Sequence, residues 1–233
     1  MKTYQDREFT GFYDQNSGKT FSDLEFWKCH FLSCAISITR NPRRRSKVRN
    51  VRFINCEQHG CALDTAIVED VLIDGLKTNG LFQTWGAVFK HVVLRGRIGR
   101  VMTSPLIADV AMGKLPFEHQ KPFDEANQLY YSTVDWALDI REAQFQEADL
   151  RGIPARLVLR DPNSQFILTR ERALQGKWRD VDLSGTHWRT AIELFIEQGV
   201  PDKVFVAPKR HPRYGALLDG LWKLRDAGVF EED

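Results

Sequence analysis

The sequence predicts a repeat-built, mainly β solenoid, and the spacing of its apolar residues is the main reason. Through residues 48–78 such side chains recur every five positions in two interleaved series, which only Gln58 interrupts. A period of five fits neither the 3.6 residues of a helical turn nor the two-residue alternation of a strand, so it indicates short stacked repeats. The series are Val48, Phe53, Gln58, Leu63, Val68 and Ile73, and Val51, Cys56, Cys61, Ala66, Val71 and Leu76.

The same five-residue step occurs on both sides of this stretch. It begins near Phe21 and returns at Leu138, so one solenoid is interrupted and then continues. The upstream members are Phe21, Phe26, Phe31 and Ile36, with Leu24, Cys29 and Cys34 two places before the last three; the downstream members are Leu138, Ile140, Ala143, Phe145, Ala148 and Leu150.

Several of these units resemble the pentapeptide-repeat family, whose units have a small residue two places before a central Phe or Leu. The units are Cys29-His30-Phe31-Leu32-Ser33 followed by Cys34-Ala35-Ile36, then Ala143-Gln144-Phe145-Gln146-Glu147 and Ala148-Asp149-Leu150-Arg151-Gly152. The resemblance implies a right-handed, four-sided parallel β-helix in which four units make one coil. Inner residues would stack on their equivalents one coil away, at about the 4.8 Å spacing of neighbouring strands.

We expect residues 1–233 to form a single domain. Residues 9–101 and 136–186 are assigned to β-helix coils, 102–135 to an insertion, and 187–233 to a helical C-terminal cap. Within the insertion, Ser104 as N-cap, Pro105 at the first helical position and Gly113 after the end predict a short helix.

Two amphipathic helices are predicted in the tail. The first ends at Gly199 and has Ser184 or Thr186 as its N-cap, and the second ends at Gly228. Covering the open end of a solenoid is their expected role, with dimerisation or partner docking as the alternative. Their apolar faces are Trp188, Ala191, Ile192 and Phe195, and Tyr214, Leu217, Leu218, Leu221 and Trp222.

Before the tail, two strands are predicted around a turn at residues 161–164. Residues 157–159 and 166–168 are the strands, because each is a short apolar run bounded by turn residues. Val181 and Leu183, two positions apart, are interpreted as a final repeat unit.

Composition narrows the classes of function. The formal net charge of +2 comes from 33 basic and 31 acidic residues, which disfavours both a nucleic-acid binder and an acidic nucleic-acid mimic. The first residues lack the apolar core of a signal peptide, and no apolar run approaches the ~18 residues that span a bilayer. The expectation is a cytoplasmic protein without membrane contact.

The four cysteines are predicted to be structural. Cys29 and Cys34, and Cys56 and Cys61, are each five residues apart, which is the repeat period and not the spacing typical of metal ligands, although His30 and His59 lie nearby. Small thiols suit a narrow apolar interior. We therefore expect no metal, no cofactor and no disulfide.

The densest basic cluster interrupts the repeat. Pro42 and Asn41 break the register there, and the loop is either a solvated excursion or a contact surface for an acidic partner or phosphate. The candidate partner-binding residues are Arg40, Arg43, Arg44, Arg45 and Lys47. The insertion, the tail helices and a second basic loop at 208–213 are the other candidate contact regions.

No catalytic motif is present. The sequence lacks Gly-x-Ser-x-Gly, His-Glu-x-x-His and phosphate-binding glycine loops, so no enzymatic activity is predicted. The histidines are scattered singly, and acid pairs such as Glu69/Asp70, Asp180/Asp182 and Asp135/Asp139 are interpreted as solvated surface.

The sequence hypothesis is a non-enzymatic protein-binding module, specifically a bacterial immunity protein or antitoxin that neutralises a cognate toxin. Three observations support it: the repeats are degenerate and keep only the core positions, the surface is differentiated, and catalytic motifs are absent. The step from these observations to immunity is an analogy with other proteins of the same fold.

One alternative is a β-helix enzyme that acts on a carbohydrate or similar substrate, with acids from successive coils near the insertion. Another is a DNA-mimicking, gyrase-protecting repeat protein, which the charge balance disfavours. The sequence does not determine the oligomeric state.

Overall fold

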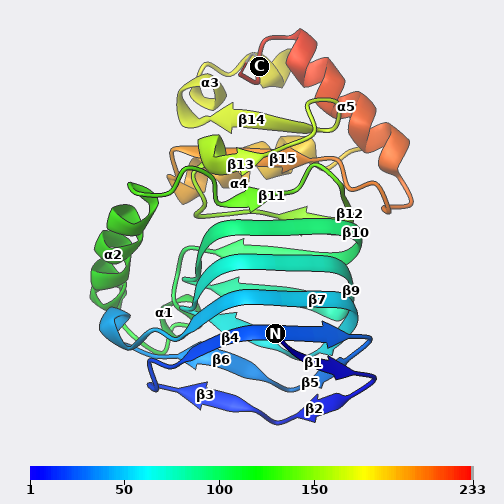
Figure 1. The fold of residues 1–233 in the computed structure, drawn as a ribbon. Coiled ribbons are helices and arrows are strands. Elements are labelled where there is room, and N and C mark those ends of the chain that lie inside the picture. Colours follow the sequence, from blue (N-terminus) through cyan, green and yellow to red (C-terminus); the bar gives the residue numbers. More distant parts are fainter. Residues whose placement is uncertain (232–233) are drawn as a thin grey trace.

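The computed structural model describes residues 1–231 and consists mainly of β-strands (Figure 1). Strands β1 to β13 join in one curled sheet in which every pair is parallel, and β14 and β15 form a separate antiparallel pair. The mainly β, parallel part of the predicted fold is therefore confirmed.

The strands of the curled sheet are β1 (Lys2–Gln5), β2 (Glu8–Thr10), β3 (Tyr13–Gln15), β4 (Thr20–Trp27), β5 (His30–Leu32), β6 (Ala35–Ile38), β7 (Lys47–His59), β8 (Ala62–Asp64), β9 (Ile67–Trp85), β10 (Val88–Ser104), β11 (Leu138–Asp139), β12 (Ala143–Asp149) and β13 (Val158–Leu159). The small sheet contains β14 (Gln165–Thr169) and β15 (Asp202–Val206). The helices are α1 (Ala108–Ala111), α2 (Lys121–Tyr131), α3 (Arg170–Leu174), α4 (Trp188–Gln198) and α5 (Tyr214–Asp226), and the 3-10 turns are η1 (Pro42–Arg44), η2 (Phe117–His119), η3 (Ala155–Leu157) and η4 (Lys177–Asp180).

The strand register explains the five-residue period. Up to Gly96, short strand segments are separated by corner residues in the left-handed backbone region, and equivalent corners lie on top of one another in successive passes of the chain. One such column contains Asp23, Asn50, Asp70 and His91, all with φ between 51° and 58°. Asn and Asp tolerate this region better than other non-glycine residues because their short polar side chains bond locally. Here the Asn50 side-chain amide donates to the Asp23 carboxylate at 2.6 Å.

Inner residues of successive passes stack as predicted. Phe26 lies opposite Phe53, which lies opposite Ile73 on the next pass. The rings of Tyr4, Phe26 and Phe53 form a stacked column with centroid separations of 5.4 and 5.1 Å. The interior is not filled completely, because a cavity of about 660 Å³ lies inside the curled sheet.

The interior position of the cysteines is confirmed. Cys29, Cys34 and Cys56 are buried, Cys61 is half-buried, and all four are free thiols. The Cys56 thiol lies 3.4 Å from the carbonyl oxygen of Phe26 on the preceding pass, and burial raises its pKa to about 11. Among residues 1–231, no three His, Cys, Asp or Glu side chains form a group that could hold a metal ion.

The insertion covers one side of the sheet. Strand β10 continues to Ser104, so that residue ends a strand and does not cap a helix as predicted; α1 starts after Ile107. Gly113 has a φ of 68° just beyond α1, as the sequence pattern predicted. The longer helix α2 lies beside the strand edges (Figure 1), and the backbone N–H of Phe89 donates to the Tyr131 hydroxyl at 3.3 Å.

The limits predicted for the coils differ from the structure at both ends. The parallel pairs start at Lys2 instead of residue 9, and they finish with β11 and β13 at residue 159 instead of 186. The two predicted strands near 157–159 and 166–168 exist, but β14 pairs antiparallel with β15 because its apolar residues pack into a second core. Val181 and Leu183 belong to that core as well and form no repeat unit.

The two predicted tail helices are confirmed as α4 and α5, although His187 is the N-cap of α4. Gly199 and Gly228 follow them with φ of 68° and 69°. The unit formed by residues 160–231 lies at the end of the curled sheet away from the N-terminus (Figure 1). Its core contains Phe166, Leu168, Trp178, Trp188, Ile192, Phe195, Phe205, Leu217, Leu221, Leu224 and Phe230.

Within residues 1–231, no helix combines the length and the apolar character required to cross a bilayer.

Candidate functional site

The basic loop between β6 and β7 is a rigid turn. The Asn41 side chain accepts a hydrogen bond from the backbone N–H of Arg43 and so caps η1. The Thr39 hydroxyl accepts from the backbone N–H of Asn41 and donates to the Asn16 side chain at 2.7 Å. These bonds fix the backbone that presents Arg43 and Arg44 to solvent.

The five predicted contact residues have three different environments. Arg43, Arg44 and Lys47 are exposed, and none of them forms an ion pair within residues 1–231. Arg40 is also exposed, but its guanidinium binds the Asp109 carboxylate of α1 at 2.7 Å. Arg45 points in the opposite direction, into the protein.

Arg45 is 6% exposed, so a partner cannot contact it in this conformation, and its predicted contact role is replaced by a structural one. Its guanidinium donates to the Gly86 carbonyl oxygen at 3.1 Å and to the Asn127 side chain at 2.6 Å. It also lies 5.0 Å from the centre of the Phe123 ring. Burial lowers the pKa of Arg45 to about 10, which leaves it protonated at neutral pH. Arg45 therefore connects the loop to α2 through its contacts with Asn127 and Phe123.

A polar pocket of about 360 Å³ lies next to this loop, between α1 and the ends of strands β3, β6 and β8. Asp64, at the end of β8, is its most unusual residue, because the side chain is 9% exposed and its Oδ1 has no hydrogen-bond partner among the described residues. Burial raises the pKa of Asp64 to about 7, the nearby Asp109 charge adds to this, and a bond from the Ala108 backbone opposes it. The pocket is lined by Gln15, Asn16, Ile38, Thr39, Arg40, Asp64, Ile107, Ala108 and Asp109.

Chemically, this pocket holds two carboxyl groups in contrasting environments. Asp109 is paired with Arg40, whereas no ion pair holds Asp64, and its raised pKa of about 7 keeps a fraction of it protonated at neutral pH. Such a contrast is the arrangement by which protein carboxyl groups divide acid and base roles. The pocket can also accommodate a small polar molecule through the orphaned oxygen of Asp64.

A second group of titratable residues lies on the outer surface near the end of the insertion. His91 Nδ1 is 3.1 Å from Asp70 Oδ1, and His91 Nε2 is 2.7 Å from Asp135 Oδ1. The hydrogen bond with His91 is the main cause of a lowered pKa at Asp135. Both ring nitrogens of His91 are therefore engaged by carboxylates, and the Trp136 ring lies 4.7 Å from the imidazole.

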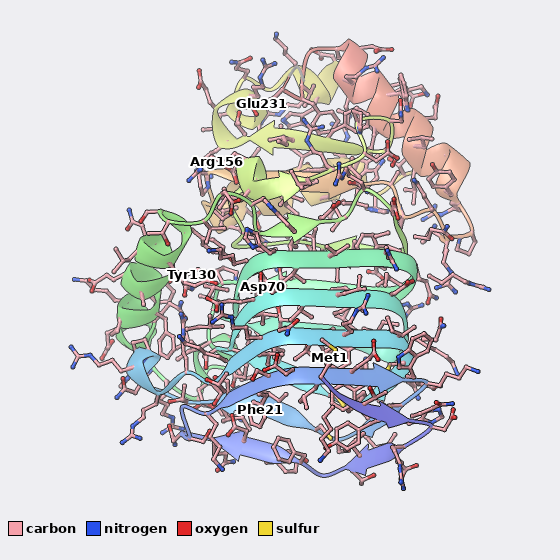
Figure 2. The ribbon with its side chains drawn as sticks, viewed as in Figure 1. Met1, Phe21, Asp70, Tyr130, Arg156 and Glu231 are labelled. Atoms are coloured by element: carbon pink, nitrogen blue, oxygen red, sulfur yellow. The ribbon has the colours of Figure 1, made fainter. Side chains whose placement is uncertain are left out.

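The structure thus brings together acids that the sequence left apart. Asp70 and Asp135 share His91, while Asp139 instead pairs with Arg141 at 2.6 Å. Glu69 accepts a hydrogen bond from the Tyr130 hydroxyl at 3.1 Å, which joins α2 to the sheet. Figure 2 shows Asp70 on the stacked strands and Tyr130 on the neighbouring helix.

The second basic loop, residues 208–213, is engaged internally. Lys209 binds Asp161 at 3.0 Å, the Arg210 guanidinium donates to the Ile98 carbonyl oxygen, and the Arg213 guanidinium donates to the Gly185 carbonyl oxygen. Arg210 therefore connects the C-terminal unit to the sheet, while Lys209 and Arg213 are engaged within that unit. Arg43 and Arg44, in contrast, form no ion pair among residues 1–231.

In comparisons with known proteins, no family model, no curated protein and no solved structure matches the chain.

Sequence reasoning missed Asp64, Asp109 and His91. Once the register is known, His91 and Asp70 are recognisable as equivalent corner positions on neighbouring passes. Asp64 had no comparable signal, since its burial depends on Ile107 and Ala108 of the insertion, which the repeat pattern does not position.

Proposed function

We propose that the parallel strands form a right-handed β-helix of pentapeptide-like coils and that this chain is a non-enzymatic protein-binding module. The observation that favours the coil is the repeating combination of a short strand segment and a left-handed corner, seen in the column of Asp23, Asn50, Asp70 and His91. A stack of such units gives a stiff scaffold on which loops can be displayed.

The binding proposal rests on Arg43 and Arg44. Both are exposed and unpaired within residues 1–231, and both lie on a turn that Asn41 caps and Arg45 anchors. A partner therefore meets two arginines whose backbone is already ordered, which reduces the entropy that binding must overcome. Arginine pairs of this kind complement carboxylates on a protein surface.

The partner class we propose is a protein with an acidic surface, and the biological role is that of a bacterial immunity protein or antitoxin that neutralises a cognate toxin. Neutralisation by occlusion requires a preformed surface and no chemistry of its own. Support comes from the loop geometry, from the absence of ion pairs at Arg43, Arg44 and Lys47 among residues 1–231, and from the internal engagement of the other basic loop.

The test is affinity purification followed by a measured dissociation constant. The tagged wild-type chain captures proteins from its native host, and the protein product of a neighbouring gene is tested directly. We expect a single stoichiometric partner whose affinity falls at least tenfold in the Arg43→Ala/Arg44→Ala variant and weakens steeply with added salt.

The matched control is Arg7→Ala/Arg97→Ala, which removes the same charge from two other exposed arginines. It should bind as the wild type does. Equal losses in both variants would show a net-charge effect, and an unchanged affinity in the loop variant would place the contact on the insertion or the tail helices.

A second candidate function is a β-helix enzyme that acts on a carbohydrate or a similar substrate. The pocket observation that favours it is Asp64, whose raised pKa of about 7 leaves it partly protonated at neutral pH, with the Arg40-paired Asp109 in the same pocket. In glycoside hydrolysis one carboxyl group donates a proton while the other acts as base or nucleophile.

Incubation with a panel of oligosaccharides tests this second candidate. Hydrolysis that declines above about pH 7 and disappears in Asp64→Asn would support it, because loss of the Asp64 proton removes the general acid. Absence of cleavage across the panel, together with toxin binding by the Asp64→Asn variant, would leave the binding module as the function.

A further inference from the structure

The cavity inside the curled sheet has the dimensions of a ligand site. Its volume of about 660 Å³ falls within the range of roughly 300–1,000 Å³ typical of small-molecule pockets. Inner side chains from Tyr4 in the first strand to Leu138 and Leu150 near the last strands line it, so the cavity follows the stack for most of its length.

The cavity is closed at one end and accessible at the other. Leu138 and Leu150 are buried where the C-terminal unit meets the sheet. At the opposite end, no described element packs against the outer side of β1, β2 and β3 (Figure 1). Phe12 and Phe21 line the cavity there, and Phe12 is 47% exposed. Figure 2 shows Phe21 at this N-terminal end.

The protein does not fill this space with its own side chains. Phe53, Ile73 and Phe82 lie on central strands and point to the interior, yet each is only partly buried. In a packed interior such residues would be in contact on all sides. Their apolar surface is therefore available to an apolar occupant, and covering it is favourable.

Two polar side chains in the lining lack partners. Gln58 is 4% exposed, and its Oε1 accepts from the Cys61 backbone N–H at 3.1 Å, while its Nε2 has no partner among the described residues. Thr84 is 3% exposed, and its hydroxyl is likewise unpartnered. Buried polar groups are rarely left unsatisfied, so each orphan requires an explanation.

The two orphans lie on neighbouring passes of the chain. Leu63 is the next inner residue after Gln58 in the five-residue series. Thr84 lies opposite Leu63 on the adjacent strand. Gln58 is also the one residue that interrupts the apolar pattern of that series. An amide donor and a hydroxyl thus occur deep in a cavity that is otherwise almost wholly apolar.

We propose that this cavity binds an elongated apolar small molecule that carries one uncharged hydrogen-bond acceptor, such as a long-chain ketone or ester. The Gln58 amide and the Thr84 hydroxyl donate to that acceptor, and the chain lies along Phe53, Ile73 and Phe82. The acceptor is uncharged because the lining contains no Lys, Arg or His to pair with a buried carboxylate.

The experiment uses the full chain and the fluorescent probe N-phenyl-1-naphthylamine. The probe should bind with one site per chain and be displaced by 2-decanone at least tenfold more readily than by decanoate. The Gln58→Leu variant removes the donor and keeps the volume, so it should bind 2-decanone about tenfold more weakly while the probe still binds. Gln144→Leu, on the outer surface of β12, is the matched control and should behave as the wild type.

A second variant tests the location. Ile73→Phe continues the aromatic column above Phe53 and occupies part of the cavity, so it should reduce probe binding while circular dichroism and the thermal melt show an intact fold. Failure of the wild type to bind the probe would overturn the proposal. So would equal displacement by decanoate, an unchanged 2-decanone affinity in Gln58→Leu, or a wild-type dimer that excludes the probe by covering the N-terminal end.

Discussion

Residues 1–159 and residues 160–231 both bury many apolar side chains, yet the first set surrounds a cavity and the second packs against itself. In the curled sheet Phe53 and Ile73 remain partly exposed toward the interior. In the C-terminal unit Phe195 and Phe205 are almost wholly buried, with ring centroids 6.3 Å apart. The contrast follows from how each region is constructed.

A five-residue unit fixes the direction and spacing of its inner side chains, so a repeat cannot shift to close a void. Helices and a two-stranded antiparallel sheet have no such constraint, and they can approach until their side chains interdigitate. The repetitive region therefore supplies a scaffold and an interior space, and the non-repetitive region supplies dense packing at one end of it.

The largest difference should appear when an aromatic ring is removed from each region. Phe195→Ala should destabilise the protein by about 3–5 kcal/mol, because a fully buried ring is lost from a packed core. Phe53→Ala should cost about 1–2 kcal/mol, since one side of that ring already faces the cavity. Urea unfolding of both variants measures this, and equal costs would show that the sheet interior is packed.

The pH dependence of stability should also show a contribution from one buried acid of the sheet region. In the sheet, Asp64 keeps its proton to a pKa of about 7 when folded, against 3.8 as its ordinary value. Folding therefore takes up a proton between these values, and stability should fall as pH rises from about 4 to about 7, by on the order of 4 kcal/mol, and stay low above that.

Asp182 in the C-terminal unit has the opposite sign, and so do Asp135, Asp139 and Asp149 of the sheet region, whose pKa values are also lowered. Hydrogen bonds from Ser184 hold the pKa of Asp182 below its usual value, so its contribution is present at neutral pH and is lost only in more acidic solution. Urea unfolding of wild type and Asp64→Asn from pH 4 to 8 tests the assignment. The slope should disappear in the variant, and its persistence would locate the titrating group elsewhere.

Within the sheet region, one loop contains both a structural and a solvent-directed arginine. Arg45→Ala should cost about 2–3 kcal/mol, because it leaves the buried Gly86 carbonyl oxygen and the partly buried Asn127 side chain without their charged donor. Arg43→Ala should change stability by less than about 0.5 kcal/mol, as is usual for exposed positions. Thermal or urea unfolding compares them, and similar costs would contradict the separate roles.

The smallest expected difference in stability is between alanine substitutions at two glycines with similar backbone angles. Gly75, a sheet corner, has φ +74°, and an added Cβ would meet Asn55 Oδ1 at 2.7 Å. Gly199, after α4, has φ +68° and open space around it. Alanine should cost about 1–2 kcal/mol at Gly75 and about 1 kcal/mol at Gly199, where only the backbone conformation is unfavourable. Melting temperatures of the two variants would rank them, and the reverse order would contradict the stacked-corner geometry.

The period of five was sufficient to predict much of the fold. The series through Val48 and Val51 placed the inner positions, and the interior location of Cys29 and Cys56 followed from it. Gly199 and Gly228 located the ends of the two tail helices because a left-handed residue after a helix is a local requirement. Local signals of this kind depend on a few neighbouring residues.

What the sequence could not predict depends on contacts between distant segments. The strand at Gln165–Thr169 has the same apolar pattern whether it continues a parallel stack or pairs antiparallel with Asp202–Val206. Arg45 was indistinguishable from Arg43 because its partners, Phe123 and Asn127, lie far along the chain.

Only part of the candidate site could be predicted from the sequence. The sequence located the arginine loop but not the pocket of Asp64 beside it, because α1 completes that pocket. The sequence showed Gln58 as the one polar residue in its apolar series. Its assignment to a ligand site required the structure, which shows that the interior is partly empty.

The hollow interior of the repetitive region is the central claim, and a crystal structure determined under xenon pressure tests it most directly. Xenon occupies apolar cavities in proteins without requiring polar contacts. We expect xenon, or a co-purified elongated ligand in its place, beside Phe53, Ile73 and Phe82, and no xenon in the core around Phe195 and Phe205. A sheet interior without xenon or ligand, with those three side chains in mutual contact, would contradict the account.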